Sequence, residues 1–379
     1  MRVYFDNAAT TPLDPEVLDA MIPVMRDDFG NPSSTHSYGR KVKAHLENSR
    51  RTIAKLLNVS PAEITFTSGG TEADNMAIRG SVHHLGVTTI ISSVIEHHAV
   101  SHTVEELANN GLVKLLHVNL LPDGHVDLNH LESLLSQNTN VLVSLMHGNN
   151  EVGNLLNIER VSQLCRQYNA LFHSDTVQTM AHYSFDFQQV DVDFAVGAAH
   201  KFNGPKGVGF LYHNKRIKIH PMITGGSQER ELRAGTENIY GIVGLAKAME
   251  IAYRDMSTKS EHIKNLKSYI IDQVKLRFPT VKFNGDAEGQ SLYTVLNLAF
   301  PPELANEMLL FNFDLNGIAI SGGSACTSGS NTGSHVIRGI GKNLDHAPVR
   351  LSFGKNNTFE EADFVLNYIG TLFQSAQSI

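Results

Sequence analysis

Two polar side chains lie just past apolar runs of the sequence. Asp175 ends the run ALFHSD (residues 170–175), and Lys201 lies shortly after VDFAVGA (residues 192–198). If both runs are strands of one α/β layer, both side chains reach the carboxyl edge of the sheet, where such sheets bind ligands. A carboxylate there can pair with a cationic ring nitrogen or cap a helix. A desolvated lysine amine can act as a Schiff-base nucleophile, whereas an ordinary lysine keeps its charge in water at the surface.

A third signal is the stretch EITFTSGGTEADN (residues 63–75), which predicts a strand, a turn at Gly69–Gly70 and a helix beginning near Thr71. The backbone N–H groups at such a helix start suit a phosphate. The alternative is a tight turn with Thr71 as its N-cap. Together, a phosphate-ready helix start, a strand-end Asp and a strand-end Lys are the parts that a pyridoxal phosphate (PLP) site requires.

The fourth candidate is Cys326, in SGGSACTSG (residues 321–329), one of only two cysteines. A packing cysteine usually has large apolar neighbours. Here glycine and serine predict a flexible loop, so the thiol is either functional or incidentally exposed. Cys165 lies in a helical pattern, RVSQLCRQY, and we interpret it as structural.

Short β-rich runs alternate with helical patterns over about residues 60 to 215, which predicts a doubly wound α/β layer with a mostly parallel sheet flanked by helices. The expected strands are residues 63–68, 88–94, 141–146, 170–175, 192–198 and 207–212. We expect a large domain over 15–250 and a smaller α+β domain over 251–379 that includes residues 1–14. Residues 238–277 look largely helical. Asp14-Pro15-Glu16 marks a helix start, and Thr358 to Glu361 forms a capping box for the last helix.

Composition restricts the class of protein. The chain has 379 residues, 41% hydrophobic and 18% charged, with a formal net charge of −7. No basic cluster is visible, which argues against direct nucleic-acid binding. No signal peptide and no apolar run near the ~20 residues of a membrane span is present, so we expect a soluble, cytoplasmic protein. Two cysteines without CxxC spacing exclude a disulfide framework and favour a reducing compartment. Rossmann, Walker and GxSxG fingerprints are absent.

A set of motifs now makes a resemblance specific. From about residue 4 to 365 the sequence is similar to the NifS/IscS-like cysteine desulfurases, PLP enzymes of the aminotransferase class V family. The motifs keep the family's order: DNAATTP, FGNPSSTHSYGR, TSGGTEADN, EHHAV, MHGNNEVG, HSDTVQ, HKFNGPKG, RAGTEN and SGGSACTSG. The resemblance implies the fold of type I PLP-dependent transferases, a homodimer with two active sites, and conversion of L-cysteine to L-alanine.

The resemblance also assigns roles around the cofactor. Lys201 would be the Schiff-base lysine and Asp175 the partner of the pyridine nitrogen. Gln178 would contact the ring hydroxyl, and His97 would stack on the ring and shuttle protons. The phosphate would be held by Gly70, Thr71, His200 and Thr236 of the partner subunit.

Further roles concern substrate and sulfur. Arg350 would clamp the substrate carboxylate, and Asn150 would lie beside it and the ring hydroxyl. Cys326 would take the sulfur as a persulfide for an acceptor, either an iron–sulfur scaffold or a tRNA-thiolation protein. Without the motifs, His97 and His98 would be interpreted as surface histidines and Arg350 as a surface ion-pair former. The roles of His36 and Tyr38 stay open.

Two departures from the family pattern are visible. The family usually has the motif SxHK, whose last residue is the Schiff-base lysine, whereas Ala198 stands here in place of the serine. One hydroxyl that would bind the phosphate is therefore missing. Losing a neutral hydrogen bond costs ~0.5–1.5 kcal/mol. Scaffold-binding members also carry a C-terminal extension, but this sequence ends at QSAQSI. Delivery to a tRNA-thiolation protein, to a scaffold by another surface or to a small thiol therefore stays open.

Three rival hypotheses remain. The same fold could act on selenocysteine or cysteine sulfinate with less need of Cys326. A cysteine hydrolase would pair Cys326 with His335 and need neither PLP nor Lys201. A PLP-containing assembly partner would have a vestigial site.

Overall fold

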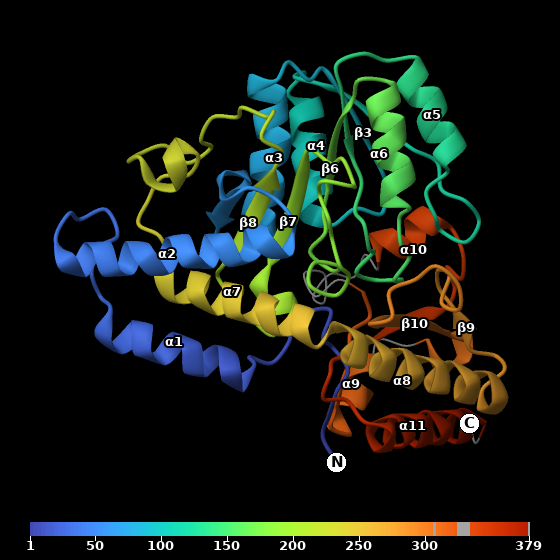
Figure 1. Ribbon diagram of the computed structural model, residues 1–379. Coiled ribbons are helices and arrows are strands. Elements are labelled where there is room, and N and C mark those ends of the chain that lie inside the picture. The colour runs from blue at the N-terminus through green and yellow to red at the C-terminus, as the bar shows by residue number, and fades with distance from the viewer. Residues whose placement is uncertain (306–307, 324–333, 378–379) are drawn as a thin grey trace.

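A seven-stranded mixed sheet forms the centre of the larger part of the molecule. The computed structural model describes residues 1–305, 308–323 and 334–377 (Figure 1). The strand order is β2 (Ile64–Thr67), β8 (Gly209–His213), β7 (Phe194–Ala198), β6 (Leu171–Ser174), β5 (Val141–Ser144), β3 (Thr89–Ser92) and β4 (Lys114–His117). β8 runs opposite to the other six strands of this sheet, antiparallel to β2 and β7, so the prediction of a mostly parallel sheet is confirmed.

Helices cover both faces of this sheet. Alternating strand residues pack in opposite directions, for example Ile90 with α4 on one face and Ile91 in the core beneath α2 and α7 on the other. Because both sets of side chains are buried, these strands are continuous runs of apolar residues, as expected for a sheet covered on both sides. One face carries α3 (Gly70–His84) and α4 (His98–Asn109). The other carries α2 (Ser37–Leu56), α5 (Leu128–Ser136), α6 (Ile158–Gln167) and α7 (Ile239–Arg254), with α1 (Pro15–Asp27) packed on α7.

A second core forms around a small antiparallel sheet. Its strands, in order, are β12 (Ala347–Ser352), β10 (Val295–Phe300) and β9 (Lys282–Phe283). Near it lies a parallel pair, β1 (Val3–Tyr4) with β11 (Ile318–Ala319). Val3 and Phe5 are buried in this second core, so the N-terminus packs with the C-terminal part of the chain. The helices of this part are α8 (Met256–Arg277), α9 (Leu309–Leu315) and α11 (Phe359–Gln377). The short helix α10 (His335–Ile340) packs instead against Ile95 and Val152.

The predicted helical stretch 238–277 is two helices, because α7 ends at Arg254 and α8 begins at Met256. Ile251 and Ala252, beyond the predicted boundary at 250, still pack in the core of the large sheet. The division of the chain into two domains stays a prediction.

Short 3-10 helices complete the elements: η1 (Pro61–Glu63), η2 (Ala199–Lys201), η3 (Gln228–Glu231) and η4 (Pro302–Leu304). Local signals set several boundaries. Asp14 caps α1 by accepting from the N–H of Glu16 at 2.8 Å, with Pro15 in first place. The capping box of α11 is confirmed by reciprocal bonds between Thr358 and Glu361 at 3.1 and 3.2 Å.

Other local predictions need correction. α3 begins at Gly70 with Gly69 as its N-cap, so the interpretation of Thr71 as an N-cap is wrong. The sequence pattern also missed β4, whose side chains are half-buried or exposed at the edge of the sheet. Within the described ranges, no helix has the length and apolar character needed to cross a membrane.

Candidate active site

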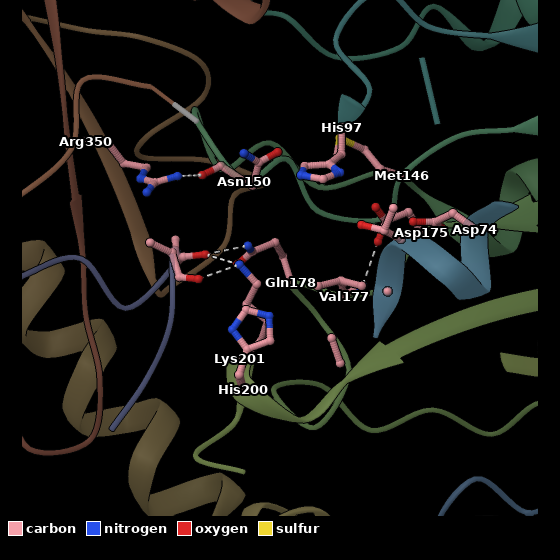
Figure 2. Close-up of a pocket in the computed structure, with 15 residues that line it drawn as sticks. Asp74, His97, Met146, Asn150, Asp175, Val177, Gln178, His200, Lys201 and Arg350 are labelled. Atoms are coloured by element: carbon pink, nitrogen blue, oxygen red, sulfur yellow. Dashed lines mark hydrogen bonds between the residues drawn. The ribbon is translucent and has the colours of Figure 1, made fainter. Parts of the chain in front are cut away.

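The carboxyl ends of the central strands, the N-terminal segment and β12 enclose a cavity of about 240 Å³ (Figure 2). Most of the residues predicted for the site line this one cavity. They are Gly70, Thr71, His97, Asn150, Asp175, Gln178, His200, Lys201 and Arg350. Segments that are far apart in the sequence therefore meet where the strand ends predicted a ligand site.

Lys201 reaches the cavity through η2, directly after β7. Its Nζ donates to the carbonyl oxygens of Ala8 at 2.6 Å and Ala9 at 2.9 Å, both in the N-terminal motif DNAATTP. Gln178 Nε2 donates to the same Ala8 carbonyl at 3.0 Å, and Figure 2 shows Gln178 and Lys201 next to each other. The backbone of the N-terminal segment therefore orients both side chains toward the cavity.

Asp175 follows β6, and its Oδ1 accepts from the N–H of Val177 at 2.9 Å. Beside it lies Asp74, which the sequence analysis missed. Asp74 is fully buried, and desolvation followed by the charges of Asp175 and Glu96 raises its pKa well above the usual range. Because Gly70 and Asp74 are four residues apart on α3, helical spacing was the signal that would have placed Asp74 in the site.

The start of α3 forms a further part of the cavity lining, close to Val177. Gly69 offers no side-chain cap, so the first N–H groups of this helix lack a side-chain capping partner, and Gly70 and Thr71 line the cavity. A Cβ on Gly70 would lie 2.7 Å from Cγ2 of Val177, so only glycine allows this close approach. Ala198 lines the same part of the cavity and provides no hydroxyl.

His200 adds a neutral hydrogen-bonding group there. Its Nδ1 lies 3.2 Å from Oγ1 of Thr10. Burial, with the charges of Lys201 and Lys206, lowers the pKa of His200 to about 4. At neutral pH the imidazole therefore offers a hydrogen bond rather than a positive charge.

His97 is the N-cap of α4, and its Nδ1 accepts from the N–H of Ala99 at 3.1 Å. In the neutral ring this bond assigns the proton to Nε2, and burial lowers the pKa of His97. His97 is half-buried and lines the cavity, so its interpretation as a surface histidine is wrong. The neighbouring His98 stacks against His102 and His335 instead.

Arg350 lies within β12 and is only 1% exposed, so its interpretation as a surface residue is also wrong. Its guanidinium donates to the carbonyl of Asn150 and to Oδ1 of Asp6, each at 2.8 Å. Its buried Nε has no hydrogen-bond partner within the described part of the chain. A planar, multi-donor guanidinium that lines the cavity suits a carboxylate ligand.

Two predicted or alternative residues, Thr236 and His335, lie outside this cavity. Thr236 lines a separate cavity of about 130 Å³ together with Ser68 and Arg233. Cys326 lies outside the described residues. His335, at the start of α10, contacts the carbonyl of Glu96 through Nε2 at 2.9 Å. Cys165 is buried in α6, where desolvation raises its thiol pKa, in agreement with a structural role.

The polar groups that line the cavity fit PLP. A lysine amine, a strand-end carboxylate and an uncapped helix start match the cofactor's aldehyde, ring nitrogen and phosphate. Lys201, Asp175 and Gly70 with Thr71 would hold these three groups. Of the residues that the structure covers, no three His, Cys, Asp or Glu side chains are grouped to hold a metal ion.

Comparison with known proteins agrees with this chemistry. The model of the aminotransferase class-V family matches residues 3–365. A protein of Bacillus subtilis (strain 168) named putative cysteine desulfurase IscS 1 is 41% identical over 374 residues, covering 97% of each chain. A solved NifS-like protein has a TM-score of 0.91 at 37% identity, covering 99% of this chain and 100% of that one. The structure titled SspA in complex with cysteine has a TM-score of 0.81 at 30% identity, covering 94% and 100%.

These matches extend over the central sheet, the second core and all segments that line the cavity. The chain therefore belongs to the aminotransferase class-V family and, within it, to the PLP-dependent cysteine desulfurases of the IscS and NifS-like type.

Proposed function

We propose that this chain is a cysteine desulfurase that converts L-cysteine to L-alanine and transfers the sulfur to Cys326 as a persulfide. One observation carries the proposal: a single cavity brings together Lys201, Asp175 and Arg350 from three distant parts of the sequence. The relative titled SspA in complex with cysteine supports L-cysteine as the substrate.

When bound, PLP withdraws electrons from the bonds of the substrate's α-carbon, and the chain's own groups direct this chemistry. Lys201 would bind the cofactor through its amine and, once released by the substrate, take the proton from the α-carbon. Asp175 would keep the ring nitrogen protonated, because a buried carboxylate favours a cation beside it.

Arg350 and His97 would orient the substrate. Arg350 lines the cavity and is already fixed by Asn150 and Asp6, so its guanidinium would bind the substrate carboxylate without a change of rotamer. His97 would keep its Nε2–H available as a donor at the cavity, because its Nδ1 is bound at the start of α4. In this tautomer His97 is a hydrogen-bond donor toward the reacting groups.

The sulfur step would use the Cys326 thiolate. It attacks the substrate sulfur, a sulfur–sulfur bond forms, and the electron pair of the breaking carbon–sulfur bond goes to the substrate carbon, which is then protonated. In balance, one cysteine and one thiol give one alanine and one persulfide. No external oxidant or reductant is needed for this half of the reaction.

Assembly and delivery are also part of the proposal. We infer a cytoplasmic homodimer in which Thr236 of the partner subunit completes each phosphate site. The placement of Thr236 outside the Lys201 cavity supports a contribution across subunits. The acceptor would be an iron–sulfur scaffold or a tRNA-thiolation protein.

Alanine production from L-cysteine by the purified protein and by Cys326→Ser, with a reductant present, tests the function. The expected result is alanine from the unaltered protein and almost none from Cys326→Ser. Equal alanine from both would contradict the persulfide role. Turnover of selenocysteine or cysteine sulfinate alone would instead identify a lyase of the same fold.

A further inference from the structure

The segment between β8 and α7 contains an unusual turn. Three consecutive non-glycine residues, Glu229, Arg230 and Glu231, have φ angles of +46°, +57° and +67°. In this left-handed region the Cβ of an L-residue approaches the following carbonyl, so successive residues there are strained. Such strain persists only where the surroundings hold it, and it clusters at functional sites.

The restraint on this turn is a buried ion pair with α2. Arg50 donates from Nη1 and Nη2 to the two carboxylate oxygens of Glu229, each at 2.8 Å. Both side chains are only 2% exposed, and Nη1 also donates to the carbonyl of Ile64 at 2.7 Å. A bidentate pair of this kind specifies geometry as well as adding energy.

The same segment holds the strand and turn that precede the start of α3. Glu229 Oε2 accepts from the N–H of Phe66, in β2, at 2.8 Å. Four residues later, Arg233 Nε donates to Oε1 of Glu72 at 2.9 Å. Glu72 in turn accepts from the N–H of Ser68 at 2.8 Å through Oε2. Residues 66–72, which include the uncapped helix start, are therefore held at both ends by residues 229–233.

The cavity linings also show that this segment lies next to the start of α3. Ser68, Gly207 and Val208 line the cavity that contains Arg233 and Thr236, and they also line a neighbouring cavity with Gly70, Thr71 and His200. Figure 1 shows the segment, coloured yellow between β8 and α7, on the side of α2 and α3. A shift of this segment would change the phosphate end of the site before it reached Lys201 or Asp175.

We propose that Arg50 and Glu229 are positioning residues for the phosphate group of PLP. Their ion pair holds the strained turn, and the turn holds residues 66–72 in the conformation that presents the first N–H groups of α3. Neither side chain touches the cofactor. The inference rests on the proposed function, because it presupposes that the cavity binds PLP.

Equilibrium binding of PLP and of pyridoxal, which lacks the phosphate, to the apoprotein tests this inference by absorbance. We expect Glu229→Gln to raise the Kd for PLP about tenfold and to change the Kd for pyridoxal less than about twofold. Arg233→Gln, whose ion pair is partly exposed and less needed for folding, should show the same selectivity to a smaller extent.

Asp193→Asn is the matched control. Asp193 is equally buried between Arg166 and Arg216, but it precedes β7, away from the strand end that leads to the cavity. This substitution should lower the melting temperature and change the Kd values for PLP and pyridoxal by the same factor. The inference would be overturned if Glu229→Gln and Arg233→Gln raised the Kd values for PLP and pyridoxal equally. It would also be overturned if they raised the Kd for PLP no more than Asp193→Asn does. An unaltered protein that bound neither ligand would overturn the proposed function and this inference with it.

Discussion

The two walls of the cavity differ in the charge and the hydrogen-bond partners of their polar groups. On the sheet-edge wall, Asp175 and Asp74 line the cavity, and the buried Glu96 lies close enough for its charge to act on Asp74. Burial raises the pKa of both Asp74 and Glu96. On the opposite wall, Arg350 is equally buried but is held by Asp6 and by the carbonyl of Asn150. The first wall suits a cofactor that brings its own cation, whereas the second suits an anionic substrate.

This difference predicts that the second wall controls the substrate and not the cofactor. Arg350→Ala should lower kcat/KM for L-cysteine about 100-fold, because charge-assisted hydrogen bonds to a carboxylate are lost and Asp6 loses its ion pair. The absorbance of bound PLP should stay unchanged. Steady-state kinetics with a spectrum of each protein would check this, and loss of the cofactor from Arg350→Ala would remove the distinction between the walls.

The buried carboxyl groups on the side of the first wall should make the stability of the protein depend on pH. Burial raises the pKa of Glu96 from 4.5 to about 8. Between these values the folded protein keeps a proton that the unfolded chain releases, so the free energy of unfolding should fall as pH rises, by at most about 1.4 kcal/mol per pH unit. The stabilising contribution is complete below pH 4.5 and is lost as pH rises through about 8.

Glu96→Gln mimics the protonated side chain, because it can still accept from Ser93 and from the N–H of Met146. Melting temperatures measured from pH 5 to 9 should therefore fall more steeply for the unaltered protein than for Glu96→Gln. Parallel curves would show that Glu96 is ionised in the folded protein.

The smallest effect is expected at the phosphate end of the first wall. Ala198→Ser would restore a hydroxyl beside the start of α3, which is worth ~0.5–1.5 kcal/mol. The Kd for PLP should fall between about twofold and tenfold, while the Kd for pyridoxal stays the same. If both ligands gained equally, the hydroxyl would be acting on the pocket and not on the phosphate.

The two walls were also unequally predictable from the sequence. Asp175 and Lys201 follow apolar runs, and the carboxyl ends of parallel strands meet at one edge, so their proximity followed from pattern alone. Arg350 lies on a strand of the second core, and nothing local shows that β12 faces the sheet edge. Its assignment came from a family motif, and its burial and its pairing with Asp6 emerged only from the fold.

Long-range packing explains the other missed features. Asp74 and Glu96 look like ordinary acids in the sequence, because their pKa values are raised chiefly by burial, which only the folded chain produces. The edge strand β4 has only two apolar residues and lacks the continuous pattern of the central strands. The Arg50–Glu229 pair joins residues far apart in sequence, and no periodicity relates them.

The central claim is that this cavity holds PLP on Lys201. Reduction of the purified protein with borohydride, followed by peptide mapping, would locate the cofactor directly. The account predicts one modified peptide, carrying PLP on Lys201, and no modification in Lys201→Ala. Cofactor attached to another lysine, or a protein that acquires no PLP when supplied with it, would contradict the account.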